Sequence, residues 1–263
     1  MLFRSVLSGK IIFDGQDITT ADRKPYRPRM QMVFQDPYSS LDPRMSVGDI
    51  VGEPLAIQRP DMPKHERHAR VLEQVRALGL NSEHLTRFPH EFSGGQRQRI
   101  SIARALIVKP ELLICDEPVS ALDVSIQAQI INMLMDLQQD MGVAFLFIAH
   151  DLSVVRHISK RVLVMYLGCV MESNSSEDLY KNPLHPYTRA LLSAIPVPDP
   201  NRSRAHRRQV LQGDVPSPIN PPQGCVFCQR CPHAKDICEH IRPAAERVSE
   251  EHIVACHRYK EII

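Results

Sequence analysis

Residues 111–118 read ELLICDEP, a nearly continuous apolar run that ends in two adjacent acids. A run of this kind is typical of a buried strand that delivers its carboxylates at the C-terminal edge of a parallel sheet. Outward from it, residues 10–195 alternate short β-branched runs with helical patterns. The 263-residue chain is therefore predicted to contain an α/β domain with a largely parallel sheet.

The flanking elements follow from the same patterns. Four more runs are predicted as strands: KIIFDG (10–15), MQMVFQ (30–35), VAFLFIAH (143–150) and RVLVMY (161–166). DPYSSLDP (36–43) is predicted as a loop. Helices are predicted over 64–80, with Val71, Leu72, Val75 and Leu78 on one face, and over 126–141, closed by Gly142.

Composition excludes several classes of protein. Lys and Arg number 32 against 30 Asp and Glu, so the net charge of +2 gives no reason to expect a nucleic-acid partner. The longest apolar run, residues 143–149, is too short to cross a bilayer. The opening MLFRSVLSGK has too short an apolar stretch for a signal peptide, so a cytosolic location is expected.

Residues 92–99, FSGGQRQR, precede the helical stretch ISIARALI. Ser93 is a natural N-cap, and Gly94 and Gly95 let a ligand approach the backbone. The start of the helix would then offer oriented N–H groups and a positive dipole end to a phosphate. The alternative is an ordinary glycine-rich turn before a helix.

The two acids of ELLICDEP predict a second part of a nucleotide site. Asp116, at the end of the strand, is suited to hold Mg²⁺, and Glu117 to orient a water that attacks a γ-phosphate. SALD (120–123) follows, and AHD (149–151) ends the next buried strand, which would bring His150 to the same edge as Glu117. The alternative is a solvated strand end with a structural histidine.

In their order and spacing, these motifs resemble the nucleotide-binding subunits of ABC transporters. FSGGQRQR matches the signature loop, LLICDEP the Walker B strand, SALD the D-loop, AHD the switch-histidine loop and MVFQDPYSSLDP the Q-loop. The tail segments NPLHPYTRALLSAIP and PSPINPPQGCVFCQRCP resemble the ATPase subunits of oligopeptide and dipeptide importers, most closely the F-type subunit. The resemblance implies a P-loop NTPase fold over residues 1–195, a RecA-like core with a helical subdomain at about 44–105. A Pro-rich linker and Cys-rich extension would occupy residues 196–263.

The resemblance also implies roles for single residues. In that family two ATPase subunits pack head to tail, and each ATP lies between the Walker A loop of one and the signature loop of the other. Ser93, Gly94 and Gly95 would thus bind the γ-phosphate of a nucleotide seated on the partner. Gln96 would support this loop, and Asp123 would bridge the two halves.

At the other half of the site, the family assigns four roles. Asp116 would position Mg²⁺, Glu117 would act as the catalytic base and His150 would contact the γ-phosphate. Gln35 would sense the nucleotide and link to the membrane subunits. The implied partners are a paralogous ATPase subunit, two transmembrane permease subunits and, indirectly, a peptide-binding protein, with the chain peripheral on the cytoplasmic side of the inner membrane.

A P-loop requires G-x-x-x-x-G-K-[ST], and the printed sequence contains no such pattern. Its single Gly-Lys pair, Gly9-Lys10, is followed by Ile11. We therefore expect an ABC ATPase subunit truncated at its N-terminus, unable to hydrolyse ATP in its own site. Loss of the leading strand and helix should leave apolar faces of ELLICD and VAFLFIA uncovered.

Five of the seven cysteines fall within the last 39 residues, spaced C-x2-C-x2-C-x6-C-x17-C. In a reducing compartment this clustering indicates metal rather than disulfides. Thiolates this close together suit either Zn²⁺ or an iron–sulfur cluster. Nearby histidines keep Zn²⁺ open, and the Cys-Pro step at 231–232 favours the cluster. The alternative is a set of buried reduced cysteines. Cys115 and Cys169, outside the cluster, are interpreted as core or strand residues.

The family pattern narrows the ligand set. It implies that Cys225, Cys231, Cys238 and Cys256 hold a [4Fe–4S] cluster, with Zn²⁺ as the alternative, and leaves Cys228 as a departure.

Three other functions remain open at this point. The chain resembles importers of other small solutes, such as nickel or glutathione. Because no P-loop pattern is present, an inactive remnant or a metal-binding module is a further alternative. An ABC protein of translation or DNA repair is disfavoured because neither a second cassette nor a long coiled coil is present.

Overall fold

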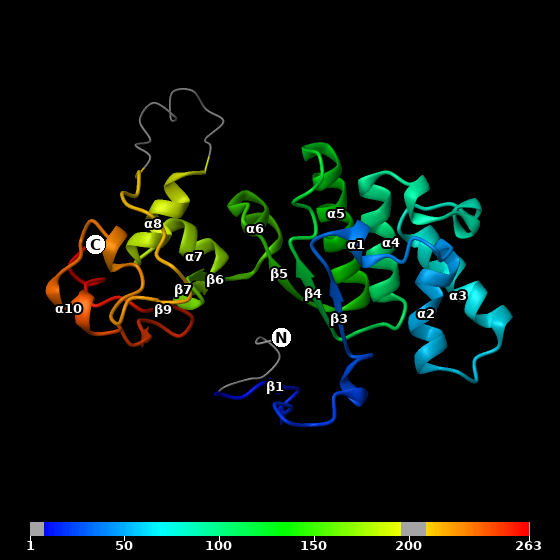
Figure 1. Cartoon of the computed structure of the whole chain (residues 1–263), viewed down its shortest axis with the longest axis horizontal. Coiled ribbons are helices and arrows are strands. Elements are labelled where there is room, and N and C mark those ends of the chain that lie inside the picture. Colours follow the sequence, from blue (N-terminus) through cyan, green and yellow to red (C-terminus); the bar gives the residue numbers. More distant parts are fainter. Residues whose placement is uncertain (1–7, 196–208, 263) are drawn as a thin grey trace. The chain divides into compact units, whose positions relative to one another are not determined.

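The computed structural model describes residues 8–195 and 209–262. The opening MLFRSVL and most of the basic part of the predicted linker lie outside the described residues. The chain divides into two compact units, Met1–His150 and Asp151–Ile263. Figure 1 labels their helices and strands.

The first unit contains most of the predicted α/β elements. Its strands are β1 (Ile12–Phe13), β2 (Gln16–Asp17), β3 (Met30–Val33), β4 (Leu112–Asp116) and β5 (Ala144–Ile148). Its helices are α1 (Pro37–Ser40), α2 (Val47–Gln58), α3 (Lys64–Ala77), α4 (Gly94–Leu106) and α5 (Val124–Met141), with the 3₁₀ turns η1 (Lys24–Tyr26), η2 (Ser82–Thr86) and η3 (Pro89–Glu91). The segment predicted as a loop at 36–43 thus contains the one-turn helix α1, which Asp36 caps by accepting from the Tyr38 N–H.

Strands β3, β4 and β5 form a parallel sheet in that order, which confirms the predicted parallel sheet for these three runs. The predicted strand at 10–15 is only the two-residue β1, which pairs antiparallel with β2 because the turn at Asp14-Gly15 folds the chain directly back. Residues that pair across parallel strands share a face. One face carries Val33, Leu113 and Cys115, all fully buried. Burial raises the pKa of the Cys115 thiol to about 12, so this residue is the inert core cysteine that the sequence predicted.

The opposite face of the sheet is open among the described residues. On β5, Leu146 is 52% exposed and Ile148 is 45% exposed. On β4, their pairing partners Ile114 and Asp116 are only half-buried. The expected uncovered face of ELLICD and VAFLFIA is therefore present on this side of the sheet.

Helices α2, α3 and α4 form the other part of the first unit, on the right in Figure 1. The predicted face of α3 is largely correct, because Val71, Val75 and Leu78 are buried while Leu72 is half-buried. Helix α5 ends at Gly142 in the left-handed conformation, with φ of 65°, as predicted.

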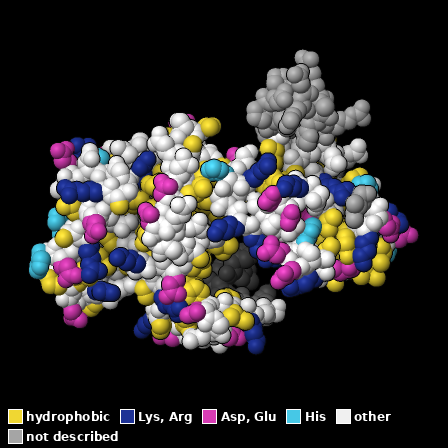
Figure 2. Space-filling model, turned by 180° about the vertical axis from the view of Figure 1, so that it is seen from behind, with side chains coloured by type: hydrophobic (Ala, Val, Ile, Leu, Met, Phe, Trp, Pro, Cys, Tyr) yellow, Lys and Arg dark blue, Asp and Glu magenta, His cyan; other side chains and the backbone are white. Residues whose placement is uncertain are grey.

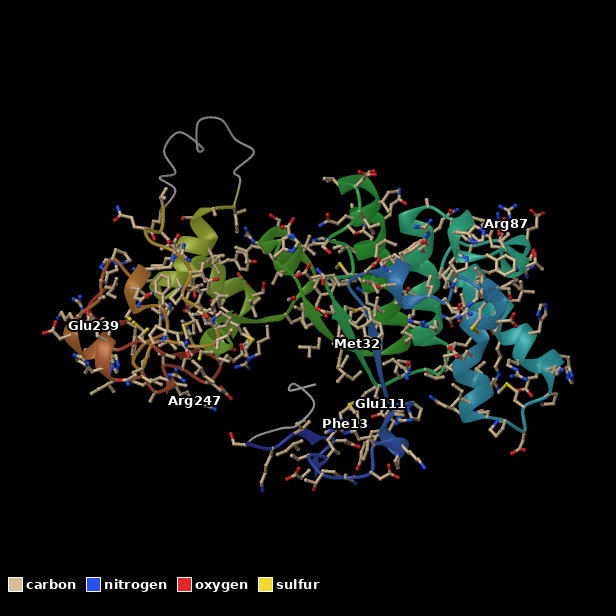
Figure 3. The ribbon with its side chains drawn as sticks, viewed as in Figure 1. Phe13, Met32, Arg87, Glu111, Glu239 and Arg247 are labelled. Carbon is tan, nitrogen blue, oxygen red and sulfur yellow. The ribbon has the colours of Figure 1, made fainter. Side chains whose placement is uncertain are left out.

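The β1–β2 hairpin is tied to the start of β4 by Arg29. Its guanidinium donates to both Glu111 carboxylate oxygens, at 2.6 and 2.7 Å, and to Asp14 at 2.7 Å. The same group lies 4.8 Å from the centre of the Phe13 ring. Figure 3 labels Phe13 and Glu111 at this junction.

The second unit is built on an antiparallel sheet in the order β6-β7-β9-β8. The strands are β6 (Arg161–Tyr166), β7 (Cys169–Ser175), β8 (Glu246–Arg247) and β9 (Ile253–Val254). The helices are α6 (Leu152–Ile158), α7 (Ser176–Lys181), α8 (Pro186–Ser193) and α10 (Asp236–His240), with the 3₁₀ turn η4 (Cys228–Arg230). RVLVMY is a strand as predicted, but it pairs antiparallel with β7 rather than in the parallel sheet, because the two-residue turn at Leu167-Gly168 folds the chain directly back.

A buried carboxylate joins β7 to the tail of this unit. Glu172 has no exposed side-chain surface and accepts from the N–H groups of Leu184 and His185 at 2.7 and 3.0 Å. Its Oε1 also lies 2.8 Å from Nε2 of His252. A buried charge must be paired and hydrogen-bonded, and these three partners meet that requirement. The sequence pattern gave no sign of Glu172, because an acid on a strand is ordinarily a solvent-facing residue.

Candidate functional site

The C-terminal end of β4 presents the two predicted acids. Asp116 is the last residue of the strand and is half-buried. Glu117 follows with φ of 42°, a conformation that residues with a Cβ rarely adopt. Its N–H donates to the carbonyl of Ile148, 2.9 Å away on β5, which holds the turn in place. Strain of this kind is often retained where a side chain must be aimed at a site.

The Glu117 carboxylate brings three predicted residues together. Its Oε2 accepts a hydrogen bond from Nε2 of Gln35 at 2.8 Å and lies 3.5 Å from Nδ1 of His150. The Glu117 side chain is 28% exposed and that of His150 is 70% exposed, so solvent or a ligand can reach the group. Three strands supply these residues, because Gln35 follows β3, Glu117 follows β4 and His150 follows β5. The prediction that Glu117 and His150 share one sheet edge is correct, and the structure adds Gln35 to it.

The FSGGQRQR motif begins helix α4 as its pattern predicts. Ser93 is the N-cap, and its Oγ accepts from the N–H of Gln96 at 3.4 Å. The Gln96 side chain returns a hydrogen bond, accepting from the Ser93 N–H at 3.0 Å. Gly94 and Gly95 form the first helical turn and carry no side chains that would block an approaching anion.

Asp123 begins helix α5. It occupies the N-cap position, but its side chain makes no capping hydrogen bond to the helix. Ser120, at the start of the same SALD segment, donates from its Oγ to the carbonyl of Glu117 at 3.1 Å. This hydrogen bond joins the segment to the strained turn that carries the acid.

The five tail cysteines all line one small cavity in the second unit. They are Cys225, Cys228, Cys231, Cys238 and Cys256, none of them in a disulfide, and the lining also includes His185. The cavity measures about 20 Å³, room for about one water molecule. Cys228 lines the cavity together with the four cysteines that the family pattern selects. Within residues 8–195 and 209–262, no three Cys, His, Asp or Glu side chains are arranged as a ready ligand set for a metal ion.

Burial around this cavity disfavours the charged form of several of its side chains. Burial raises the pKa of Cys225 to about 11, and it also raises the pKa of Cys231 and Cys256. Burial lowers the pKa of His185 to about 4, so its ring is neutral. Its Nδ1 accepts from the Tyr187 N–H at 3.0 Å, which leaves the ring proton on Nε2.

Charged side chains of both signs intermingle on the face that Figure 2 shows, which agrees with the near-neutral net charge. In the part of the chain that the structure describes, no helix is both long and apolar enough to cross a membrane.

Comparison with known proteins gives consistent matches. The family profile described as "ABC transporter" matches residues 2–120, and the profile "Oligopeptide/dipeptide transporter, C-terminal region" matches residues 171–238. The oligopeptide transport ATP-binding protein OppF of Salmonella typhimurium is 53% identical over 251 residues, which are 94% of this chain and 75% of that protein. The oligopeptide transport ATP-binding protein AppF of Bacillus subtilis is also 53% identical, over 95% of this chain and 77% of its own length.

Two solved structures share the fold. CbiO1 of Clostridium perfringens, part of the ABC transporter complex cbiONQ, aligns with a TM-score of 0.60 and 28% identity over 67% of this chain and 69% of its own. The ATP-binding cassette MJ0796, in a dimeric post-hydrolysis state bound to ADP and Pi, aligns with a TM-score of 0.59 and 28% identity. That alignment covers 65% of this chain and 75% of the other.

Proposed function

This chain belongs to the ABC transporter family of ATP-binding proteins, and from that premise we propose that it energises an importer of oligopeptides or dipeptides. The predicted ABC nucleotide-binding fold is confirmed, and the family is one of ATPases. The observation that carries the proposal is the cluster of Gln35, Glu117 and His150 at one edge of the sheet, in which Gln35 donates a hydrogen bond to Glu117 and His150 lies 3.5 Å from it. The relatives named for oligopeptide transport support the substrate class.

At this edge the proposed chemistry is divided among four residues. Asp116 positions Mg²⁺, and Glu117 polarises the water that attacks the γ-phosphate of ATP. His150 contacts that phosphate, and Gln35 reports its presence through the hydrogen bond to Glu117. The hydrogen bond holds the carboxylate in one orientation, which general-base catalysis requires.

The start of helix α4 acts on a second nucleotide. Ser93, Gly94 and Gly95 bind the γ-phosphate of an ATP seated on a partner subunit, and Gln96 holds Ser93 through their reciprocal hydrogen bonds. Asp123 bridges the two subunits, in agreement with its carboxylate making no capping hydrogen bond in its own helix.

The nucleotide seated in cis needs a P-loop. The printed sequence contains no G-x-x-x-x-G-K-[ST] pattern, so we propose that these 263 residues alone do not hydrolyse ATP at Asp116 and Glu117. The open face of β4 and β5 supports this, because a further strand and helix would have apolar surface to cover there. The part of the proposed machinery that these residues do contain acts in trans, the signature helix completing a site on a partner that carries a P-loop.

The proposed assembly contains this chain, a paralogous ATPase subunit and two permease subunits that receive peptide from a binding protein. The chain is peripheral on the cytoplasmic side of the cell membrane. The dimeric cassette among the solved relatives supports a pair of ATPase subunits. Within this chain, we retain the prediction of an ATPase domain over residues 1–195, with its helical subdomain at about 44–105, and an extension over 196–263.

The cysteine cavity is proposed to hold a [4Fe–4S] cluster or Zn²⁺. The residues fit the group in type, because five thiols outside any disulfide, from residues 225–238 and 256, line one cavity; their side chains would have to converge further to form the ligand set. Cys225, Cys231, Cys238 and Cys256 are the proposed ligands, and the bound group would supply a cross-link between residues 225–238 and residue 256. The same cavity supports a second candidate function, that of a metal-binding module without ATPase activity. Importers of nickel or glutathione remain alternatives for the solute.

The trans role is tested by mixing the chain with a paralogous ATPase subunit that carries a P-loop. We expect association that depends on ATP, measured by analytical ultracentrifugation. Ser93→Asp keeps an N-cap but places a negative charge where the phosphate binds, so it should abolish this association. Ser82→Asp, the same change at an exposed serine outside the site, is the matched control. Failure of the unaltered chain to associate, or normal association of Ser93→Asp, would contradict the proposal.

A further inference from the structure

The glycines at the start of α4 face the segment that begins α5. A Cβ placed on Gly95 would lie 2.5 Å from Cγ2 of Ile126, and one placed on Gly94 would lie 3.3 Å from Cδ2 of Leu122. The first distance is far inside van der Waals contact. The two helix starts are therefore packed against each other with no space for a side chain at position 95.

Ile126 cannot relieve this contact by rotating away at low cost. Its Cγ2 is attached directly to Cβ, and β-branched residues in a helix keep one strongly preferred χ1 rotamer. A Cβ at position 95 would thus displace the helix backbone rather than a flexible side-chain end. Gly95 lies inside a helix, where alanine is intrinsically favoured over glycine, so its presence needs a cause in packing or in ligand binding.

Other contacts continue the pairing along the two helices. Arg99 on α4 lies within 3.3 Å of the amide oxygen of Gln129 and 3.9 Å of the Met133 sulfur on α5. It also donates to the carbonyl of Leu78 at 2.8 Å. Because contacts on both helices advance in the same direction, α4 and α5 run parallel and their N-termini lie at the same end.

We propose that Ile126 is a positioning residue for the signature loop, packing against Gly95 so that the starts of α4 and α5 move as one body. Ser93 and Asp123, the N-cap residues of the two helices, then keep a fixed separation. A displacement of Asp123 by a partner subunit shifts the phosphate-binding N–H groups of α4, and the reverse also holds. Gly95 is glycine because Ile126 occupies the space beside it, in addition to any approach of phosphate. The functional part of this inference rests on the proposed role of the signature loop in trans.

The packing part is tested by a double-mutant cycle on thermal stability. Without a clash, Gly95→Ala should raise Tm, because alanine favours the helix. We expect it to lower Tm by several degrees in the unaltered chain and to raise Tm in the Ile126→Ala background. Ile126→Val is the matched control: it keeps a methyl at the Cγ2 position, so Gly95→Ala should still lower Tm there. A rise in Tm for Gly95→Ala in the unaltered chain would overturn the proposal.

The positioning part is tested by the ATP-dependent association with a P-loop-bearing paralogue. Gly95→Ala should weaken association roughly tenfold, about the loss of one hydrogen bond to a charged group, because it moves the phosphate-binding N–H groups. The Gly95→Ala/Ile126→Ala double variant should recover most of it, and the Gly95→Ala/Ile126→Val variant should not. A double variant that folds but does not recover would show that Gly95 serves only the phosphate, which overturns the positioning role. If the unaltered chain shows no association, the trans function fails, and the sign reversal in Tm alone decides the inference.

Discussion

The two faces of the parallel sheet differ sharply although the same three strands form both. On one face, Leu113 and Cys115 of β4 are fully buried. On the other face, Leu146 and Ile148 of β5 are about half exposed. Both faces are apolar, so alternation of residue type cannot distinguish them. The difference shows that these strands are built for cover on two sides and that the described residues supply it on one.

The covered face contributes the buried apolar contacts of the sheet, and the candidate site lies at the C-terminal ends of its strands. Glu117 and His150 lie beyond the ends of β4 and β5, and the Glu117 N–H is held by the carbonyl of Ile148. The group formed with Gln35 therefore depends on the register of three strands.

The largest expected effect is on the covered face. Leu113→Ala should lower the free energy of unfolding by about 2–5 kcal/mol, because it leaves a cavity in a fully buried position. Leu146→Ala, the matched change on the open face, should cost less than about 1 kcal/mol, because half of the side chain is already exposed. Urea unfolding of the two variants measures both values. Equal costs would show that the open face is covered in solution.

The second largest expected effect is on the exposed apolar surface of the open face rather than on the free energy of unfolding. Leu146→Lys should lower the binding of a hydrophobic fluorescent dye and slow aggregation, because it places a charge within an exposed apolar face. Leu163→Lys on β6, where the side chain is 53% exposed, is the control in the second unit. An equal drop in dye binding for both variants would show that the dye does not distinguish the open face from other exposed apolar residues.

The sequence predicted the parallel sheet of β3, β4 and β5 and the shared edge of Glu117 and His150, because each follows from local pattern and from the geometry of parallel sheets. It did not predict the antiparallel pairing of residues 161–166, since a strand's partner is decided by contacts far along the chain. The burial of Glu172 and the contact of Ile126 with Gly95 were missed for the same reason. Residue type at one position does not reveal which distant group will lie beside it.

The smallest expected effect concerns the junction of the hairpin with the start of β4. Hydrogen bonds from Arg29 hold the pKa of Glu111 below its usual range. A carboxylate with a lowered folded pKa stabilises the fold above its unfolded value of about 4.5 and loses that contribution as pH falls through the folded value. Glu111→Gln should therefore give a small loss of Tm at pH 7, reduced by salt because the pair is exposed, and none in strong acid. If the hairpin also shields the open face, Glu111→Gln will raise dye binding at pH 7, and Leu146→Lys will remove that increase.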